Sequence, residues 1–183
     1  MKIVIALTGG SGAPYFTALL ERLKPTSAEL EVVSSATGRQ VLQHETGKTW
    51  KEVTEGLVVH SERNMGASIA SGSNRIDSMV VVPCSMSTLA EISLGTSSHL
   101  IHRAASVQLK ERRPLILVPR ESPYSLIHLQ AMTRVTEAGG MILPASPGFY
   151  HHPKSVDDLV KNIVDRILDQ IGCSDKTIER WGS

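Results

Sequence analysis

The stretch that decides the fold spans residues 114–122 and reads Pro114-Leu115-Ile116-Leu117-Val118-Pro119-Arg120-Glu121-Ser122. Its four consecutive aliphatic residues predict a short strand buried on both faces, as in a parallel sheet. A proline does not fit inside a central strand, so the two prolines mark the ends of this one. Ligands of open α/β sheets bind outside the carboxyl ends of the strands. Arg120 and Glu121 therefore follow the strand where a ligand would lie, with a surface ion pair as the alternative from this segment alone.

Strand-like and helix-like segments alternate along the chain. The sequence predicts strands over 3–7, 30–33, 57–59, 78–82, 115–118 and 141–143. It predicts helices over 14–23, 37–45, 100–111, 125–138 and 155–171, and the start of another over 87–92. Pro83 is expected to stop the fourth strand, because proline cannot donate to a sheet ladder. This alternation is typical of an α/β protein with a doubly wound parallel sheet. We expect a single domain over residues 1–183, with 173–183 as a C-terminal tail that contains Trp181.

Composition excludes several classes of protein. The net charge of +1 over 183 residues gives no electrostatic reason to expect nucleic acid or an acidic membrane as a partner. No apolar run approaches the roughly 18 residues that span a bilayer, and we expect a soluble cytoplasmic protein. Cys84 and Cys173 form neither a disulfide framework nor a metal set. The histidines lack carboxylate partners at metal-ligand spacing, so no metal site is expected.

A glycine-rich loop, Thr8-Gly9-Gly10-Ser11-Gly12-Ala13, follows the first predicted strand and opens a helix. Glycines let the backbone approach a phosphate, and a helix N-terminus offers free amides and a positive dipole. The loop is not G-x-G-x-x-G, no acidic residue ends the second strand in the ribose-binding position, and the lysine of a P-loop is absent. A phosphate or flavin site is therefore favoured over an NAD site, with a simple tight turn as the alternative.

A hydroxyl-rich loop, Pro83-Cys84-Ser85-Met86-Ser87-Thr88, follows the strand predicted over 78–82. Three hydroxyls before a helix suit a phosphate or the edge of an isoalloxazine ring, although ordinary helix capping needs only one of them. Cys84 has no neighbouring base or cation that would make it a nucleophile. Ligand-type residues follow five predicted strands at one edge of the sheet, over 8–13, 34–37, 83–88, 119–121 and 144–150.

Basic residues on later elements are candidates for a second phosphate site. Arg103 and Lys110 are seven residues apart on a predicted helix and share a face. With Arg120 and Arg166 they would form a basic cluster, whereas a solvated helix face is the alternative, above all for Lys110. Tyr150 follows the last predicted strand and would donate to a phosphate oxygen or serve as a plain turn aromatic.

Together these motifs resemble the UbiX-type flavin prenyltransferases, a family formerly labelled 3-octaprenyl-4-hydroxybenzoate or phenylacrylic acid decarboxylases. The resemblance runs from Met1 to about Gly182 and includes Arg180-Trp181. It is carried by Thr8–Ala13, Pro83-Cys84-Ser85, Arg103-Ala104-Ala105, Leu109–Leu115, Pro119-Arg120-Glu121, Ile127-His128-Leu129 and Pro147–His151.

The resemblance implies a flavodoxin-like (Rossmann-like) fold, an activity and a set of site residues. The implied activity is a metal-independent alkylation of reduced FMN by dimethylallyl phosphate, at N5 and then at C6, which makes prenylated FMN for UbiD-type decarboxylases. The residues implied to bind FMN are Gly10, Ser11, Gly12, Ser35, Ser85, Met86, Ser87, Thr88 and Arg120. Those implied to bind the donor phosphate are Lys110, Arg103, Tyr150 and Arg166. Those implied in catalysis are Glu121, Glu45 and Ser11.

The chain departs from the family pattern at two places, and two other functions remain as alternatives. Family members usually have Ala where this chain has Gly10, a small change that keeps Ser11 in place. The stretch from Gly47 to Asn64 matches only loosely, so no residue is carried over from it. The family's assembly implies a homo-oligomer of twelve subunits, with interfaces that wall the active site. The alternatives are a flavin-dependent cysteine-type decarboxylase on the same fold and a flavin-binding module without chemistry.

Overall fold

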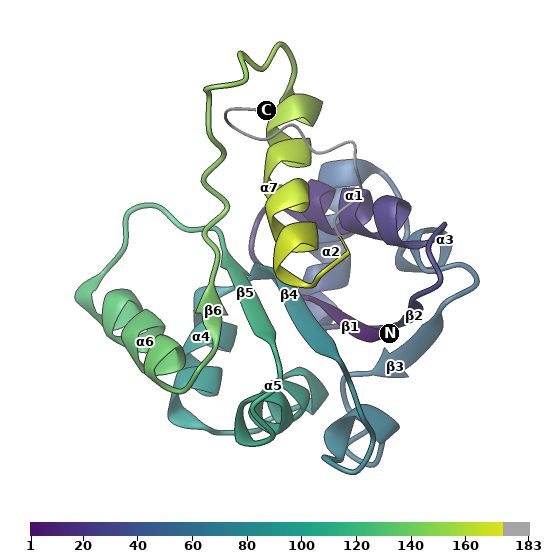
Figure 1. The fold of residues 1–183 in the computed structure, drawn as a ribbon, viewed down its shortest axis with the longest axis vertical. Helices are drawn as coiled ribbons and strands as arrows, with labels where there is room; N and C mark the ends of the chain where they lie inside the picture. The colour runs from purple at the N-terminus through teal and green to yellow at the C-terminus, as the bar shows by residue number, and fades with distance from the viewer. Residues whose placement is uncertain (174–183) are drawn as a thin grey trace.

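The computed structural model describes residues 1–173 and contains one six-stranded sheet (Figure 1). Its strands are β1 (Lys2–Leu7), β2 (Glu29–Ser34), β3 (Val58–Ser61), β4 (Ser78–Cys84), β5 (Leu115–Pro119) and β6 (Met141–Ile142). They pair in the order β3-β2-β1-β4-β5-β6, and every pair is parallel. The order reverses between β1 and β4, which confirms the doubly wound sheet and gives it the Rossmann strand order.

Helices cover both faces of this sheet, so the fold has three layers. They are α1 (Ala13–Leu23), α2 (Ala36–Thr46), α3 (Trp50–Val53), α4 (Met86–Leu94), α5 (Leu100–Lys110), α6 (Leu126–Glu137) and α7 (Val156–Gln170), with a 3₁₀ turn η1 (Ser68–Ala70). Buried residues of α1 and α7 pack on one face, and those of α4, α5 and η1 pack on the other. Figure 1 shows α1 beside α7, away from α4 and α6. Among the described residues, no helix combines the length and the apolar character needed to cross a membrane.

The central strands are buried on both faces, as their aliphatic runs predict. In β1, Ile3, Ile5 and Leu7 join the core under α1 and α7, while Val4 and Ala6 join the core on the opposite face. The strand predicted over 115–118 is β5, and all of its residues are buried. Each central strand thus contributes to two hydrophobic cores, which fixes its register, because a slip of one residue would exchange the two sets of side chains.

Two sequence predictions differ from the structure. Pro83 does not stop β4, which continues to Cys84; the register between Val81 and Cys84 is irregular, and such an irregularity accommodates a residue without an N–H. The helix α3 and the turn η1 were not predicted. A capping box between Thr49 and Glu52 supports α3, which is too short to show a hydrophobic period. The expected tail, except Cys173, and its Trp181 lie outside the described residues.

A charged network joins the first three strands. Glu31 on β2 is 5% exposed and accepts hydrogen bonds from Lys2 Nζ at 2.7 Å and from His60 Nε2 at 2.5 Å. Burial alone would raise the pKa of Glu31, but the hydrogen bonds from Lys2 and His60 outweigh it, and the pKa lies below its usual value. The carboxylate therefore stabilises the folded state in its ionised form.

We predict that Glu31→Leu destabilises the protein by roughly 1.5–3 kcal/mol, because Lys2 and His60 lose hydrogen bonds to a buried carboxylate. The loss is limited because Lys2 is partly exposed and keeps Glu29 as a partner at 3.9 Å. Since the folded-state pKa of Glu31 is depressed, its contribution is complete above the unfolded-state pKa near 4.5 and is lost as pH falls through the folded-state value. Urea unfolding at pH 7 and at steps below pH 4.5 tests both points. Equal stability of variant and wild type at pH 7 would contradict the prediction.

Candidate functional site

The ends of β1 and β4 meet at the point where the strand order reverses, and Thr8 ties them together. Its buried Oγ1 donates to the carbonyl of Pro83 at 2.8 Å and accepts the N–H of Ser85 at 2.7 Å. The Thr8 N–H also reaches the Pro83 carbonyl at 3.3 Å. The glycine-rich loop 8–13 and the hydroxyl-rich loop 83–88 are therefore held side by side. This crevice is where ligands of doubly wound sheets bind.

The hydroxyl-rich loop caps α4 and also leaves one of its serines exposed. Ser85 Oγ accepts the N–H of Thr88 at 3.3 Å and lies 3.1 Å from both Ser87 Oγ and Thr88 Oγ1. Capping thus occupies Ser85, whereas Ser87 is exposed at the helix N-terminus, where an anion is favoured. Met86 is half-buried against the core. Burial raises the pKa of the Cys84 thiol, which stays protonated and is no nucleophile.

A carboxylate already occupies the N-terminus of α1. Glu45 Oε2 accepts the N–H of Gly12 at 2.9 Å and that of Ala13 at 2.8 Å. Burial would raise the pKa of Glu45, but hydrogen bonds from Ser11, Gly12 and Ala13 and the charge of Arg120 lower it below its usual value. Glu45 is therefore ionised at neutral pH. Its charge argues against a phosphate at the 8–13 loop and leaves the α4 terminus as the better anion site.

The start of α2 packs tightly against the first loop. Ser35 caps this helix, and its Oγ accepts the N–H of Gly38 at 3.0 Å. A Cβ on Gly38 would lie 2.8 Å from the Leu7 carbonyl oxygen, and one on Gly9 would lie 2.7 Å from Thr37 Cγ2. Glycine at both positions therefore brings Ser35 to the same edge as Ser11.

The end of β5 supplies the cation and the acid that the sequence places there. Arg120 Nε donates to the carbonyl of Ser11 at 3.2 Å, so Arg120 bridges from β5 to the glycine-rich loop. Glu121 is half-buried, and its Oε1 accepts the N–H of Ser122 at 3.0 Å. Tyr15 on α1 also faces this region: burial raises the pKa of its hydroxyl, and the nearby charge of Arg120 opposes the shift.

Three residues expected to bind the donor phosphate, Arg103, Lys110 and Arg166, contact other groups and not Arg120. Arg103 and Lys110 do share a face of α5, but Arg103 Nε donates to the carbonyl of Ala70 and Lys110 pairs with Glu111. Lys110 ends α5 close to the start of β5, at the amino edge of the sheet. Arg166 on α7 pairs with Asp169 at 3.7 Å, in the C-terminal half of that helix. The expected cluster with Arg120 therefore does not form within one chain.

Tyr150 lies on the loop between β6 and α7, at the carboxyl edge. It is 81% exposed, while Gly148 in the same loop donates to Asn162 Oδ1 on α7 at 3.0 Å. The loop is thus tied to α7 and leaves the Tyr150 ring at the surface.

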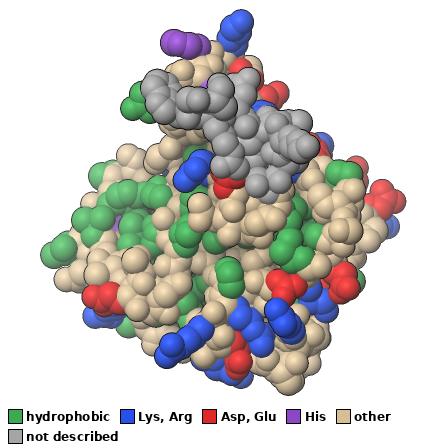
Figure 2. Space-filling view, in the orientation of Figure 1, with side chains coloured by type: hydrophobic (Ala, Val, Ile, Leu, Met, Phe, Trp, Pro, Cys, Tyr) green, Lys and Arg blue, Asp and Glu red, His purple; other side chains and the backbone are tan. Residues whose placement is uncertain are grey.

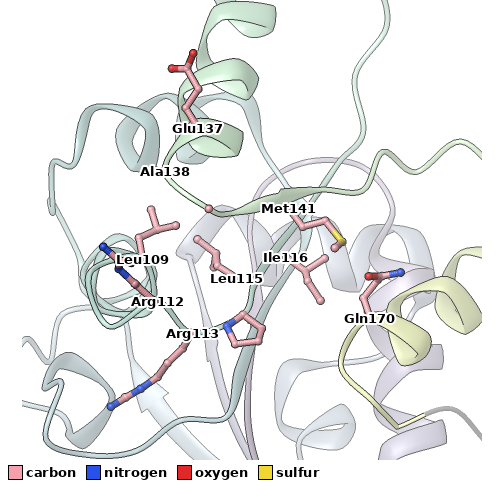
Figure 3. Close-up of a pocket in the computed structure, with 11 residues that line it drawn as sticks. Leu109, Arg112, Arg113, Leu115, Ile116, Glu137, Ala138, Met141 and Gln170 are labelled. Atoms are coloured by element: carbon pink, nitrogen blue, oxygen red, sulfur yellow. The ribbon is translucent and has the colours of Figure 1, made fainter.

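A hollow of about 640 Å³ lies at the opposite edge of the sheet (Figure 3). Leu109, Leu115 and Met141 contribute apolar side chains to it, and Arg112 and Gln170 lie on its rim. None of the residues expected to bind a ligand lines it. Within residues 1–173, no group of three or more His, Cys, Asp or Glu is placed to hold a metal ion.

Two site residues were not identified from the sequence. The sequence shows Thr8 only as part of the glycine-rich loop, because its bridging role depends on β4 being the neighbour of β1. Tyr15 lies in a predicted helix, and its contact with the site depends on the position of Arg120. The spacing of Tyr15 three residues after Gly12 was the one available indication.

Comparison with known proteins agrees with this geometry. The sequence model of the family described as Flavoprotein matches residues 1–168. The flavin prenyltransferase UbiX of Thermoplasma acidophilum is 46% identical over 183 residues, which cover 99% of this chain and 100% of the relative. The crystal structure of a dodecameric FMN-dependent UbiX-like decarboxylase from Escherichia coli O157:H7 has a TM-score of 0.96 at 41% identity and covers all of both chains. The structure of AnUbiX in complex with FMN and dimethylallyl pyrophosphate has a TM-score of 0.96 at 42% identity, over 100% of this chain and 97% of that one.

The doubly wound fold and the crevice between β1 and β4 define the class of the protein as a flavoprotein. The full-length identity with several relatives is more specific. The chain belongs to the UbiX family of flavin prenyltransferases, which confirms the resemblance of its motifs.

The glycines of the site give a matched pair of predictions. Gly38→Ala should destabilise the protein by roughly 1–3 kcal/mol, because its Cβ would meet the backbone of Leu7. Gly10→Ala should leave stability unchanged, because its Cβ would lie 3.6 Å from Pro83 and 3.7 Å from Ser85, at ordinary contact distance. Thermal unfolding compares the two variants. A Gly10→Ala protein that is the less stable of the pair would show that the loops are packed differently.

Proposed function

We propose that this protein transfers a dimethylallyl group from dimethylallyl phosphate to reduced FMN, at N5 and then at C6. The observation that carries the proposal is the crevice between β1 and β4, where Arg120, which follows β5, donates to the carbonyl of Ser11. Full-length similarity to flavin prenyltransferases supports it, as does the relative whose structure contains FMN and dimethylallyl pyrophosphate.

The residues of the crevice fit FMN. The flavin ring can contact the space beside Gly10. The exposed Ser11 and Ser87 offer hydroxyl donors, and the guanidinium of Arg120 offers a cation. The residues that would hold FMN are Gly10, Ser11, Gly12, Ser35, Ser85, Met86, Ser87, Thr88 and Arg120. The flavin phosphate lies at the start of α4, since Glu45 occupies the start of α1. Reduced FMN supplies the nucleophilic atoms of the reaction.

The two carboxylates have different tasks. Glu45 is ionised and accepts hydrogen bonds from Gly12 and Ala13, so it orients Ser11 and is able to accept a proton. Glu121 follows Arg120 two residues after the end of the buried strand β5, and its Oε1 accepts the N–H of Ser122. A monophosphate leaves more easily when protonated, and a positioned carboxylic acid is a common proton donor in such a step. Glu121 is therefore the proton donor to the departing phosphate.

The donor phosphate requires a second copy of the chain. Lys110 and Arg166 lie away from Arg120 within one chain, whereas Tyr150 is exposed at the carboxyl edge. An assembly in which a neighbour's Lys110 or Arg166 approaches Tyr150 completes the site. Exposed apolar side chains of α6, among them Leu126 and Ile127, supply a surface for such contacts (Figure 2). We infer a homo-oligomer, and the dodecameric relative supports twelve subunits.

The product is prenylated FMN, and a UbiD-type decarboxylase is the proposed recipient. A cytoplasmic location is part of the same proposal. Solved structures of lower identity, such as the epidermin biosynthesis protein EpiD at 17%, share the fold alone and leave the chemistry open.

Mass spectrometry of the flavin tests the function. The protein, incubated anaerobically with reduced FMN and dimethylallyl phosphate, should add one five-carbon unit to FMN. A flavin that binds and stays unmodified would favour a binding module. Oxidative decarboxylation of a thiol substrate without prenyl addition would favour the cysteine-type decarboxylase.

Glu121→Gln should lower turnover by the roughly 10²–10⁴-fold typical of a lost general acid, with both ligands still bound. The substitution keeps the size of the side chain and removes its titration. Turnover under saturating FMN and donor measures the effect, and FMN titration is the control. Near wild-type turnover across pH would mean that Glu121 only orients Arg120.

Arg166→Ala should raise the KM for the donor by roughly 10- to 150-fold, the range for a lost charge-assisted hydrogen bond, and leave FMN affinity nearly intact. Arg75→Ala is the matched control, because Arg75 is a highly exposed arginine at the amino edge. Steady-state kinetics and FMN titration separate the two effects. An equal loss of FMN affinity in Arg166→Ala would contradict the assignment to the donor.

A further inference from the structure

The loop after β3 brings one more carboxylate to the carboxyl edge of the sheet. Glu62 follows β3 directly, and its side chain is only 16% exposed. β3 is the edge strand beside β2 (Figure 1), so Glu62 lies next to the turn that leads from β2 into α2. That turn carries Ser35.

The Glu62 carboxylate contacts the start of α2 at two points. Its Oε2 accepts the N–H of Ala36 at 3.3 Å, and its Oε1 lies 3.5 Å from Arg39 Nη2. Arg39 Nη1 in turn donates to the carbonyl of Ser34 at 2.8 Å. The ion pair therefore holds the residues on both sides of Ser35.

Glu62 is itself fixed by the helix on its other side. Its carbonyl accepts the N–H of Leu100 at 2.8 Å, and Leu100 is completely buried at the start of α5. The backbone of Glu62 thus belongs to the packed layer under the sheet. A charged side chain on such a rigid base stabilises one geometry of the turn that it contacts.

We propose that Glu62 is a positioning residue of the flavin site, which acts through Arg39 and the N–H of Ala36 to hold Ser35 against FMN. This inference rests on the proposed function, in which Ser35 contacts the flavin. Ser35 Oγ accepts the N–H of Gly38, so the hydroxyl hydrogen is the group left for a ligand. Its direction depends on the shape of the turn that Glu62 and Arg39 maintain.

FMN titration of Glu62→Ala tests the inference. The Kd for FMN should rise roughly five- to tenfold, because partly exposed charged contacts contribute less than buried ones. The KM for dimethylallyl phosphate at saturating FMN and the Tm should stay at wild-type values. In the flavin-free variant, the amide of Gly38 should exchange hydrogen faster, since its partner is Ser35 Oγ. Arg39→Met should cause a similar loss of affinity, and the double variant should lose no more than the larger single loss.

Glu55→Gln is the matched control, because this substitution also removes one negative charge. Glu55 is exposed and lies near the same strand, β3. It should bind FMN like the wild type. Wild-type FMN affinity in Glu62→Ala would overturn the inference, and so would a loss of affinity that is matched by a lower Tm and slower donor kinetics. Failure of the proposed function would instead appear in the wild-type protein, as FMN that gains no five-carbon unit.

Discussion

The site depends on one buried hydroxyl at the point where the strand order reverses. Thr8 Oγ1 donates to the Pro83 carbonyl and accepts the N–H of Ser85, so one side chain satisfies backbone groups of the neighbouring strand. These bonds hold the loops after β1 and β4 at a fixed separation. Gly38, Arg120 and Ser35 then position the loops after β2 and β5 against this pair.

Charge divides the crevice into regions with different tasks. Glu45 neutralises the start of α1, which removes it as an anion site and leaves the start of α4 for a phosphate. Arg120 bridges the two sides of the crevice and precedes Glu121 on the same strand end. In the proposed function, separate elements thus accommodate an anionic flavin and an anionic donor, and the donor requires cations that lie apart from Arg120 within one chain.

Much of the fold follows from short aliphatic runs bounded by turn residues, such as Leu115–Val118 between two prolines, which are typical of the central strands of a parallel sheet. Elements without such a run were missed: α3 has four residues, and its stability depends on one capping box. The prediction that β4 stops at Pro83 was wrong, because the proline is accommodated by an irregular register between β4 and β5. This register depends on two strands and is not visible in the sequence of one. Ser11, Ser85 and Arg120 could be placed from loops that follow strands. Lys110 could not, since spacing along a helix shows a shared face but not what that face meets.

A crystal structure of the protein grown with FMN tests the central claim most directly. The flavin should lie between the loops 8–13 and 83–88, with its phosphate at the start of α4 near Ser87 and with Arg120 in contact. A flavin bound instead in the hollow lined by Leu109, Leu115 and Met141, at the opposite edge of the sheet, would contradict the account.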